Sequence, residues 1–142
     1  MRHKCLDEDQ RAALRRLRRA QLTEAQRIRS VVADSYLLTP AHLRSPCRIA
    51  TLTEARQVAM YLIRTRVLWP TPTHNRAFPC VRIGRLLGGR DHTTIMHGVV
   101  VIAARLVSAR QEDAALRQMV RAIGAALDAT DQDPAHAGQR AA

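Results

Sequence analysis

Two adjacent glycines, Gly88 and Gly89, separate two stretches of chain in which apolar residues recur with the period of an α-helix. Glycine readily adopts the left-handed backbone that ends many helices, so either residue is suited to terminate the first stretch. Asp91 follows closely and is a favourable N-cap for the second stretch, which opens with small polar residues. Two short helices joined by a glycine turn form a helix-turn-helix, although many helical hairpins share that pattern. This feature restricts the fold to one in which short helices pack at an angle.

The apolar pattern predicts both helices of the motif. The first is expected over Cys80–Leu87, and the second begins at His92. The second helix has an apolar series at i, i+4, i+7 and i+11, which consists of Ile95, Val99, Ile102 and Leu106. Such a series buries one face of the helix and leaves the remaining faces, with their polar residues, exposed.

Three helices are predicted before the loop at residues 45–50. The first covers about residues 7–21, with acids in its first turn and arginines behind them, an order that suits the helix dipole. The second is expected to start at the capping box Thr23-Glu24-Ala25-Gln26. Its buried face should comprise Ile28, Val31, Val32 and Ser35. Thr39 followed by Pro40 predicts a third, short helix that ends near Arg44.

Two further helices and two non-helical segments complete the prediction. Another capping box, Thr51 to Glu54, predicts a helix to about Val67, and a last helix is expected from about Gln111 to Leu127. The central helix should bury Ala55, Val58, Ala59, Leu62 and Ile63 and expose Arg56, Gln57 and Arg64. The last helix should bury Ala115, Leu116, Met119, Ile123 and Leu127. Residues 65–79 contain three prolines and predict a long loop, and residues 128–142 predict a disordered tail.

The composition favours an all-α fold and excludes several other classes. The chain has 142 residues with one Phe, one Trp and two Tyr, so an aliphatic core of packed helices is expected. No apolar run is long enough for a membrane span, and the N-terminus has no apolar secretory region. The three cysteines are far apart and form no CxxC pair, which favours free thiols. We therefore expect a cytoplasmic chain without a membrane or a disulfide framework.

The basic residues are concentrated in the middle of the chain. The formal net charge is +11, and every base except Lys4 is arginine. Residues 36–110 carry 11 bases and only 2 acids, whereas residues 111–142 carry 3 bases and 5 acids. A positive block on a background with few acids is typical of a chain that binds a polyanion. A generally arginine-rich and alanine-rich protein would show part of this bias as well.

The segment GGRDHTTIMH (88–97) resembles the signature of the C-terminal DNA-binding domain of the bacterial replication initiator DnaA. The flanking segments 28–46, 54–64 and 82–89 resemble the opening helices, the central helix and the first motif helix of that domain. The resemblance implies a Trp-repressor-like helix-turn-helix fold of about six helices. It also implies recognition of a nonamer such as TTATCCACA, the DnaA box.

The resemblance further implies roles for individual residues. Asp91, His92 and Thr93 would read bases in the major groove, supported by Thr94 and His97. Arg48 would enter the minor groove. The residues expected to hold phosphates are Arg56, Gln57, Arg64 and Arg90. Independently of the family, short hydrogen-bonding residues at the start of a recognition helix suit base edges, and the helix dipole beside Arg90 suits a phosphate.

The sequence departs from the family in three places. The loop SPCRIA (45–50) is less basic, and the segment 65–79 is longer than the tight connection usual in the family. These 142 residues contain no GxxxxGK[ST] phosphate loop, so neither nucleotide binding nor ATPase activity is expected. The expected organisation is a basic N-terminal helix at 1–22, the DNA-binding domain at 23–127 with an insertion at 65–79, and the tail at 128–142.

Other readings of the same residues are less favoured. His92 and His97 lie about 140° apart around a helix, so they do not form the i, i+4 pair of a zinc site. Cys80 with His92 lacks a third catalytic group. Trp69 and Phe78 should pack beneath their loop rather than stack on bases. The arginines of the N-terminal helix would form a solvated face, a second DNA contact or a membrane-surface helix; they are Arg15, Arg16, Arg18 and Arg19.

Together these observations predict an all-α protein that binds double-stranded DNA at DnaA-box-like sites and regulates replication initiation or transcription. We expect no enzymatic activity, no cofactor and no metal. The alternatives are a module that binds a replication or transcription protein, a phage or mobile-element repressor, and a transposase-associated domain. A single helix-turn-helix can bind a nonamer as a monomer, so the sequence does not require a dimer.

Overall fold

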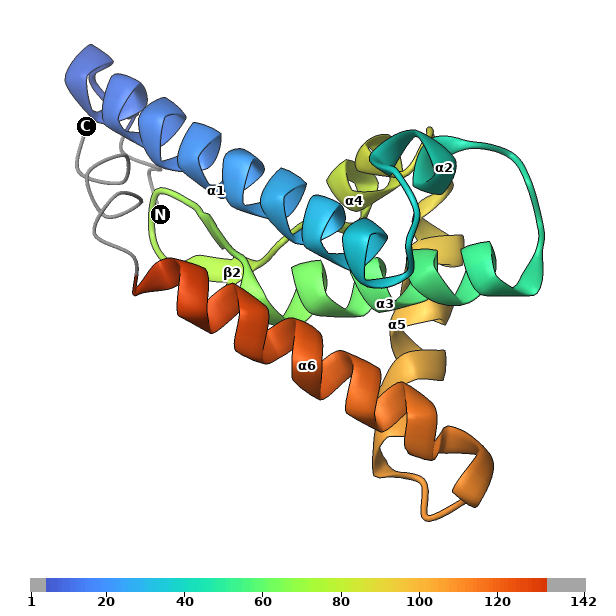
Figure 1. Cartoon of the computed structure of the whole chain (residues 1–142). Coiled ribbons are helices and arrows are strands. Elements are labelled where there is room, and N and C mark those ends of the chain that lie inside the picture. The colour runs from blue at the N-terminus through green and yellow to red at the C-terminus, as the bar shows by residue number, and fades with distance from the viewer. Residues whose placement is uncertain (1–4, 133–142) are drawn as a thin grey trace.

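Residues 5–132 are described by a computed structural model, which contains six α-helices and a short two-stranded sheet (Figure 1). The elements, in chain order, are α1 (Glu8–Ser35), α2 (Pro40–Arg44), α3 (Ala50–Arg66), β1 (Leu68–Pro70), β2 (Asn75–Ala77), α4 (Cys80–Leu86), α5 (His92–Val107), the 3-10 turn η1 (Gln111–Asp113) and α6 (Ala114–Asp131). The expected helical fold of about six helices is therefore confirmed, with a small antiparallel sheet that was not predicted.

The first 28 helical residues form one helix rather than two, so the predicted start at Thr23 is wrong. The Thr23 hydroxyl donates to the carbonyl oxygen of Arg19 at 3.1 Å, which a threonine inside a helix can do without breaking it. The N-cap is Asp7, whose side chain accepts from the backbone of Gln10 at 2.7 Å while the Gln10 side chain accepts from Asp7. The basic extension before residue 23 is thus continuous with the helix that opens the domain.

The two halves of α1 have different surroundings. Its buried residues, Ala25, Ile28, Val32 and Ala33, all lie in the second half. In the first half Leu17 is 56% exposed, so this leucine is not part of the core. The predicted inward face after residue 27 is confirmed, since Val31 and Ser35 are half-buried beside the buried positions.

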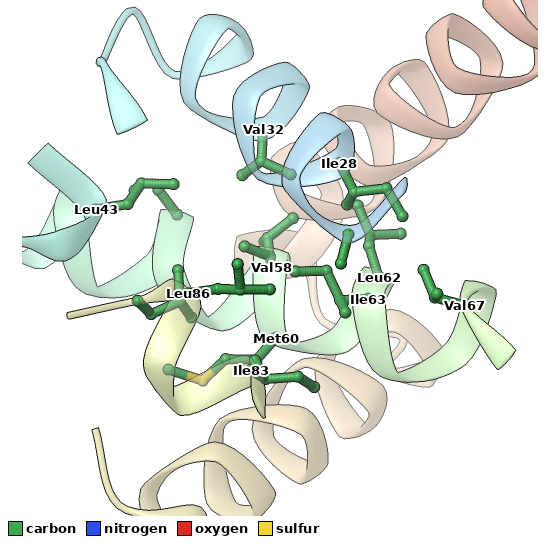
Figure 2. Close-up of a cluster of buried hydrophobic side chains, with 14 of the residues drawn as sticks. Ile28, Val32, Leu43, Val58, Met60, Leu62, Ile63, Val67, Ile83 and Leu86 are labelled. Carbon is green, nitrogen blue, oxygen red and sulfur yellow. The ribbon is translucent and has the colours of Figure 1, made fainter. Parts of the chain in front are cut away.

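The core is built around α3, which lies between α1 on one side and α4 and α5 on the other. Figure 2 shows side chains of α1, α3 and α4 meeting in one cluster, with Ile28 and Val32 facing Val58 and with Ile83 beside Met60. On α3, all five residues that were predicted to face inward are buried. The helix begins at Ala50 after Ile49, which makes no side-chain cap, so the capping box predicted at Thr51 is wrong.

α3 and α5 pack closely. Gly98 lies where a Cβ atom would be 2.4 Å from the Met60 sulfur, so only glycine fits without a shift of that side chain. The apolar series predicted for α5 is confirmed: Ile95 and Ile102 are buried, and Val99 and Leu106 pack against the core.

The segment 65–79 is ordered rather than an irregular loop, which corrects the prediction: its first two residues end α3, and residues 67–78 form a hairpin. β1 and β2 are antiparallel, with Trp69 opposite Arg76. Trp69 and Phe78 are buried, and their ring centroids are 5.4 Å apart in an edge-to-face arrangement. The expectation that these rings pack beneath the segment is confirmed, and this packing explains why a segment with three prolines is ordered.

α6 continues beyond Leu127 to Asp131, so the helix is longer than predicted and the predicted disorder of residues 128–131 is wrong. Asp128 accepts from Arg66 at 2.5 Å and Asp131 accepts from Arg27 at 2.9 Å, and these ion pairs hold the last turn. Ala115 is exposed rather than inward, whereas the other residues predicted for this face are buried or half-buried. The rest of the predicted tail, 133–142, lies outside the described residues.

Within residues 5–132, no helix is by itself long and apolar enough to cross a membrane. Among the described residues, one pair of helical segments, His92–Val107 and Gln111–Asp131, is long and apolar enough when the two are taken together. They are bent by 115° relative to each other.

Candidate nucleic-acid interface

The turn between α4 and α5 depends on three glycines. Gly88 and Gly89 have φ angles of 89° and 82°, in the left-handed region that favours glycine. The backbone N–H groups of Gly89 and Arg90 both donate to the carbonyl oxygen of Gly84, at 2.8 and 3.0 Å. A Cβ atom on Gly84 would lie 2.1 Å from the Arg90 oxygen. The turn therefore sets α5 against α4 in a fixed helix-turn-helix arrangement.

The first turn of α5 is exposed to solvent. Asp91, His92, Thr93 and Thr94 are all exposed, whereas Ile95 is fully buried. Asp91 has the backbone of an N-cap but its side chain does not cap the helix, contrary to prediction. Its Oδ2 atom accepts from the Thr93 hydroxyl at 2.7 Å, and its Oδ1 atom lies 2.9 Å from Nδ1 of His92. The Asp91 side chain thus caps neither Thr93 nor Thr94, whose backbone N–H groups can donate to an external acceptor.

The hydrogen bond from Thr93 is the main reason that the pKa of Asp91 is below its ordinary value, and the neighbouring His92 lowers it further. Asp91 is therefore ionised at neutral pH. Its carboxylate holds the side chains of His92 and Thr93 beside each other at the exposed end of the helix.

A depression beside this helix end gathers most of the residues predicted to contact DNA. It is lined by Arg48, Thr53, Arg56, Gln57, Met60, Arg90, Thr94 and His97, which come from the loop before α3, from α3, from the turn and from α5. A second depression, on the other side of Arg90, is lined by residues of α2, the following loop and the turn: Arg44, Ser45, Pro46, Gly88, Gly89, Arg90, Asp91 and Thr94. His92 and Thr93 line neither depression and lie exposed at the start of α5.

Arg56 was predicted to project outward to a phosphate, and its position contradicts this. The residue is only 3% exposed. Its Nε atom donates to the Leu43 oxygen at 2.9 Å, its Nη1 atom to the Cys47 oxygen at 2.6 Å and its Nη2 atom to the Ser45 oxygen at 2.7 Å. Burial lowers the pKa of the Arg56 guanidinium, and the nearby charge of Arg90 lowers it further. Arg56 thus fixes the loop before α3, because backbone carbonyls that water would otherwise solvate depend on it.

The other arginines of the predicted site differ in their freedom. Arg48 is exposed in the loop that Arg56 holds, and it makes no hydrogen bond or ion pair with the described part of the chain. Arg90 is half-buried and donates from Nη2 to the Ser45 oxygen at 2.7 Å. Arg64 stands apart from both depressions, near the other end of α3, where its Nη1 atom donates to the Phe78 oxygen at 2.6 Å.

Sequence reasoning missed Arg44, which is exposed at the end of α2 and lines the second depression. Its only signal was its place in the last turn of a predicted short helix. Thr53 was also missed, because it was read as part of a capping box.

The lining of the two depressions is strongly positive. Asp91 is the only acidic residue among the residues that line them. Glu54, the nearest acid in sequence to Arg56, is directed elsewhere: it accepts from Tyr36 at 2.9 Å and from Arg105 at 3.0 Å. Burial and the Glu54 carboxylate raise the pKa of Tyr36, so the tyrosine hydroxyl keeps its proton. A positive, shallow and open surface beside an exposed helix end suits the backbone of a nucleic acid.

Residues 25–102 match the sequence model of a family described as the bacterial dnaA protein helix-turn-helix. This segment covers the second half of α1 and every element that forms the two depressions. The chain belongs to the DnaA helix-turn-helix family. The helix-turn-helix of this family binds double-stranded DNA, so DNA binding is the activity that the fold supports.

Several chromosomal replication initiator proteins DnaA are similar to this chain. The DnaA protein of Spiroplasma citri is 34% identical over 98 residues, which are 69% of this chain and 19% of that protein. That of Rhodopseudomonas palustris is 43% identical over 96 residues, 68% of this chain and 18% of the relative. That of Cereibacter sphaeroides is 45% identical over 74 residues, 52% of this chain and 14% of the relative. The chain spans less than a fifth of the length of these DnaA proteins.

Proposed function

We propose that this chain binds double-stranded DNA sequence-specifically, at nonamers like the DnaA box, with the start of α5 in the major groove. The observation that carries the proposal is the exposed helix end at Asp91–Thr94 beside a depression lined by Arg48, Gln57 and Arg90. Recognition helices of the helix-turn-helix class contact base edges with their N-terminal residues. This arrangement supports a surface on which groups that read bases and groups that bind phosphates lie beside each other.

The residues proposed to read bases are Asp91, His92 and Thr93. Thr93 offers a methyl group that can contact a thymine methyl, and His92 offers ring nitrogens to base acceptors or donors. A carboxylate can accept from a cytosine amino group. Because Asp91 already binds Thr93 and His92, the three side chains present one preorganised set of groups. Thr94 and His97 lie behind them on the wall of the depression.

The proposed phosphate and minor-groove contacts surround this set. Gln57 and Arg90 line the depression between α3 and α5, and Arg48 extends from the loop that Arg56 fixes. Arg48 is the residue proposed to enter the minor groove, since it is exposed and without a partner in the described part of the chain. Arg64 uses one nitrogen for the Phe78 oxygen and is proposed to contact a phosphate with its other donors. Such contacts supply affinity for any sequence, and they weaken as salt rises.

Fluorescence anisotropy tests the proposal with a labelled duplex that carries one TTATCCACA site and with the same duplex scrambled. At about physiological salt, we expect the site to be preferred by at least about tenfold, which corresponds to about 1.4 kcal/mol. Equal binding to the two duplexes would show a DNA-binding protein that does not read this nonamer. Binding to neither would favour a module that binds a protein partner.

We further propose that these residues act by occupying their sites, and so regulate replication initiation or transcription without hydrolysing ATP. The support is that the 142 residues contain no GxxxxGK[ST] loop. A competition assay tests this step: the purified chain should displace a full-length DnaA protein from a duplex with one DnaA box. Failure to displace it at saturating concentration would contradict the proposal.

A further inference from the structure

Two arginines from segments far apart in sequence, Arg18 and Arg82, meet at the hairpin that follows α3, and Arg85 lies next to Arg82. Arg18 lies in the first half of α1, and Arg82 and Arg85 lie one turn apart on α4. Trp69 of β1 lies between the first two: its ring centroid is 4.4 Å from the guanidinium carbon of Arg82 and 5.1 Å from that of Arg18. We call Arg18, Arg82 and Arg85 the arginine cluster.

The packing around Trp69 holds this cluster in place. The Trp69 side chain is buried and in contact with both guanidinium groups, with Phe78 edge-on to its ring. Arg18 also donates from Nε to the Pro70 oxygen at 3.1 Å. Arginine on an aromatic face keeps its N–H donors at the ring edge, where they can reach a further acceptor. The hairpin thus orders two long side chains that would otherwise lose conformational freedom on binding a ligand.

The cluster has no acidic partner in the described part of the chain. None of the ion pairs among residues 5–132 includes Arg18, Arg82 or Arg85. Burial lowers the pKa of the Arg82 guanidinium, and the charges of Arg85 and Arg18 lower it further. Like charges that are held together without a counter-charge are stabilised when an anion binds.

We propose that the arginine cluster binds phosphates of the same duplex whose bases α5 reads, as a second anchoring site outside the major groove. This inference rests on the proposed function of α5. In helix-turn-helix complexes the first helix crosses the DNA backbone, and α4, which carries Arg82 and Arg85, is the first helix here. Arg76, exposed on β2 opposite Trp69, extends the positive surface on the same face of the hairpin. The insertion at 65–79 then acts as a support for phosphate-binding arginines.

The first test compares Arg85→Gln with Arg121→Gln. Both arginines are exposed on helices and make no ion pair with the described residues, but Arg121 lies on α6, which Figure 1 shows on the opposite side of α3 from α4. The logarithm of the binding constant is measured against the logarithm of salt concentration. Arg85→Gln should reduce the slope by about 0.9, the value for one phosphate contact, and Arg121→Gln should leave it unchanged. Equal slopes for the wild type and Arg85→Gln overturn the proposal.

The second test uses Trp69 as a local probe, because it is the only tryptophan in the chain. Binding of a phosphate to Arg82 changes the charge next to the ring, so the fluorescence of Trp69 should change when DNA is added. The change should follow the same titration curve as the anisotropy and persist in Arg121→Gln. Unchanged Trp69 emission at saturating DNA also overturns the proposal. This readout requires no variant and is therefore independent of any effect of a substitution on folding.

Failure of this proposal can be distinguished from failure of the proposed function. Sequence reading is measured as the preference of the wild type for the nonamer over the scrambled duplex. The arginine cluster is measured as a difference in salt slope between variants, and phosphates produce it on either duplex. Arg85→Gln should lower the affinity for both duplexes by the same factor and leave the preference unchanged.

Discussion

Arg56 and Arg90 donate hydrogen bonds to one acceptor, the carbonyl oxygen of Ser45, each from Nη2 at 2.7 Å. Arg56 belongs to α3, Arg90 to the turn before α5, and Ser45 to the loop between α2 and α3. The two hydrogen bonds therefore join these three segments of the candidate interface. The loop that they hold carries Arg48. The position of the proposed minor-groove residue therefore depends on a buried arginine whose guanidinium group donates to backbone oxygens of the loop.

Substitution Arg56→Ala should destabilise the fold by about 3 kcal/mol, because the backbone oxygens of Leu43, Ser45 and Cys47 would lose a charged donor in a partly buried region. Urea unfolding of the variant and the wild type measures the difference. Arg56→Lys should lie between the two, since an ammonium group cannot reach all three oxygens. The matched control is Arg121→Ala, which removes an exposed arginine and should change stability by less than about 0.5 kcal/mol. A loss at Arg56→Ala no larger than this would contradict the role assigned to Arg56.

The two glycines of the turn should respond differently to alanine. Both have a left-handed φ, but a Cβ atom on Gly88 would lie 2.1 Å from the Arg44 oxygen, whereas one on Gly89 would meet nothing within 4 Å. Gly89→Ala should cost only the backbone strain of about 1–2 kcal/mol. Gly88→Ala adds a clash with the backbone of α2 and should cost clearly more. Thermal unfolding measures both variants, and equal losses would show that the α2 contact does not constrain the turn.

Apolar periodicity predicted the buried faces of α3 and α5, and the segment around Gly88 predicted the motif that positions Asp91, His92 and Thr93. These features depend on local spacing, which the sequence contains. The burial of Arg56 does not follow from spacing, because its acceptors belong to a loop with no periodic pattern. On a helical wheel Arg56 looks like an outward residue, and only the path of residues 43–47 turns that side of the helix into an interior.

Two other predictions, the helix start at Thr23 and the irregular loop at residues 65–79, were wrong for different reasons. The capping-box pattern at Thr23 is compatible with a helix interior, where the hydroxyl returns to the Arg19 oxygen, and no Gly or Pro interrupts the helix there. The hairpin has strands of only three residues, too short for an alternating pattern, and it is ordered by the burial of Trp69 and Phe78. The burial of these two rings cannot be identified from neighbouring residues alone.

Asp113 should contribute to stability at neutral pH and lose that contribution in acid. Arg105 donates to it at 2.8 Å, and this hydrogen bond is the main reason that the pKa of Asp113 lies below its ordinary value. Because the pKa is lower in the folded than in the unfolded chain, the contribution is present above about pH 4, the unfolded value, and disappears as pH falls through the folded value. Asp113→Asn should therefore be less stable than the wild type at pH 7, and the difference should shrink as pH falls below about 4.

Unfolding by urea at a series of pH values measures this convergence. Asp34→Asn is the matched control, since Asp34 is exposed and its side chain makes no hydrogen bond or ion pair with the described residues. Its stability curve should run parallel to that of the wild type. A curve for Asp113→Asn that is also parallel would show that the Arg105 pair does not contribute.

His92→Ala tests the assignment of base reading to the start of α5. The side chain is exposed and is held by Asp91 only through an Oδ1–Nδ1 contact of 2.9 Å, so its removal should not unfold the protein. Affinity for a duplex with one DnaA box should fall by about 1–3 kcal/mol, while affinity for the scrambled duplex should hardly change. Arg121→Gln is the control, because Arg121 is exposed on α6 and makes no ion pair with the described residues, and it should leave both affinities unchanged. If His92→Ala weakened binding to the two duplexes equally, His92 would be a general DNA contact and base reading would have to lie elsewhere on the surface.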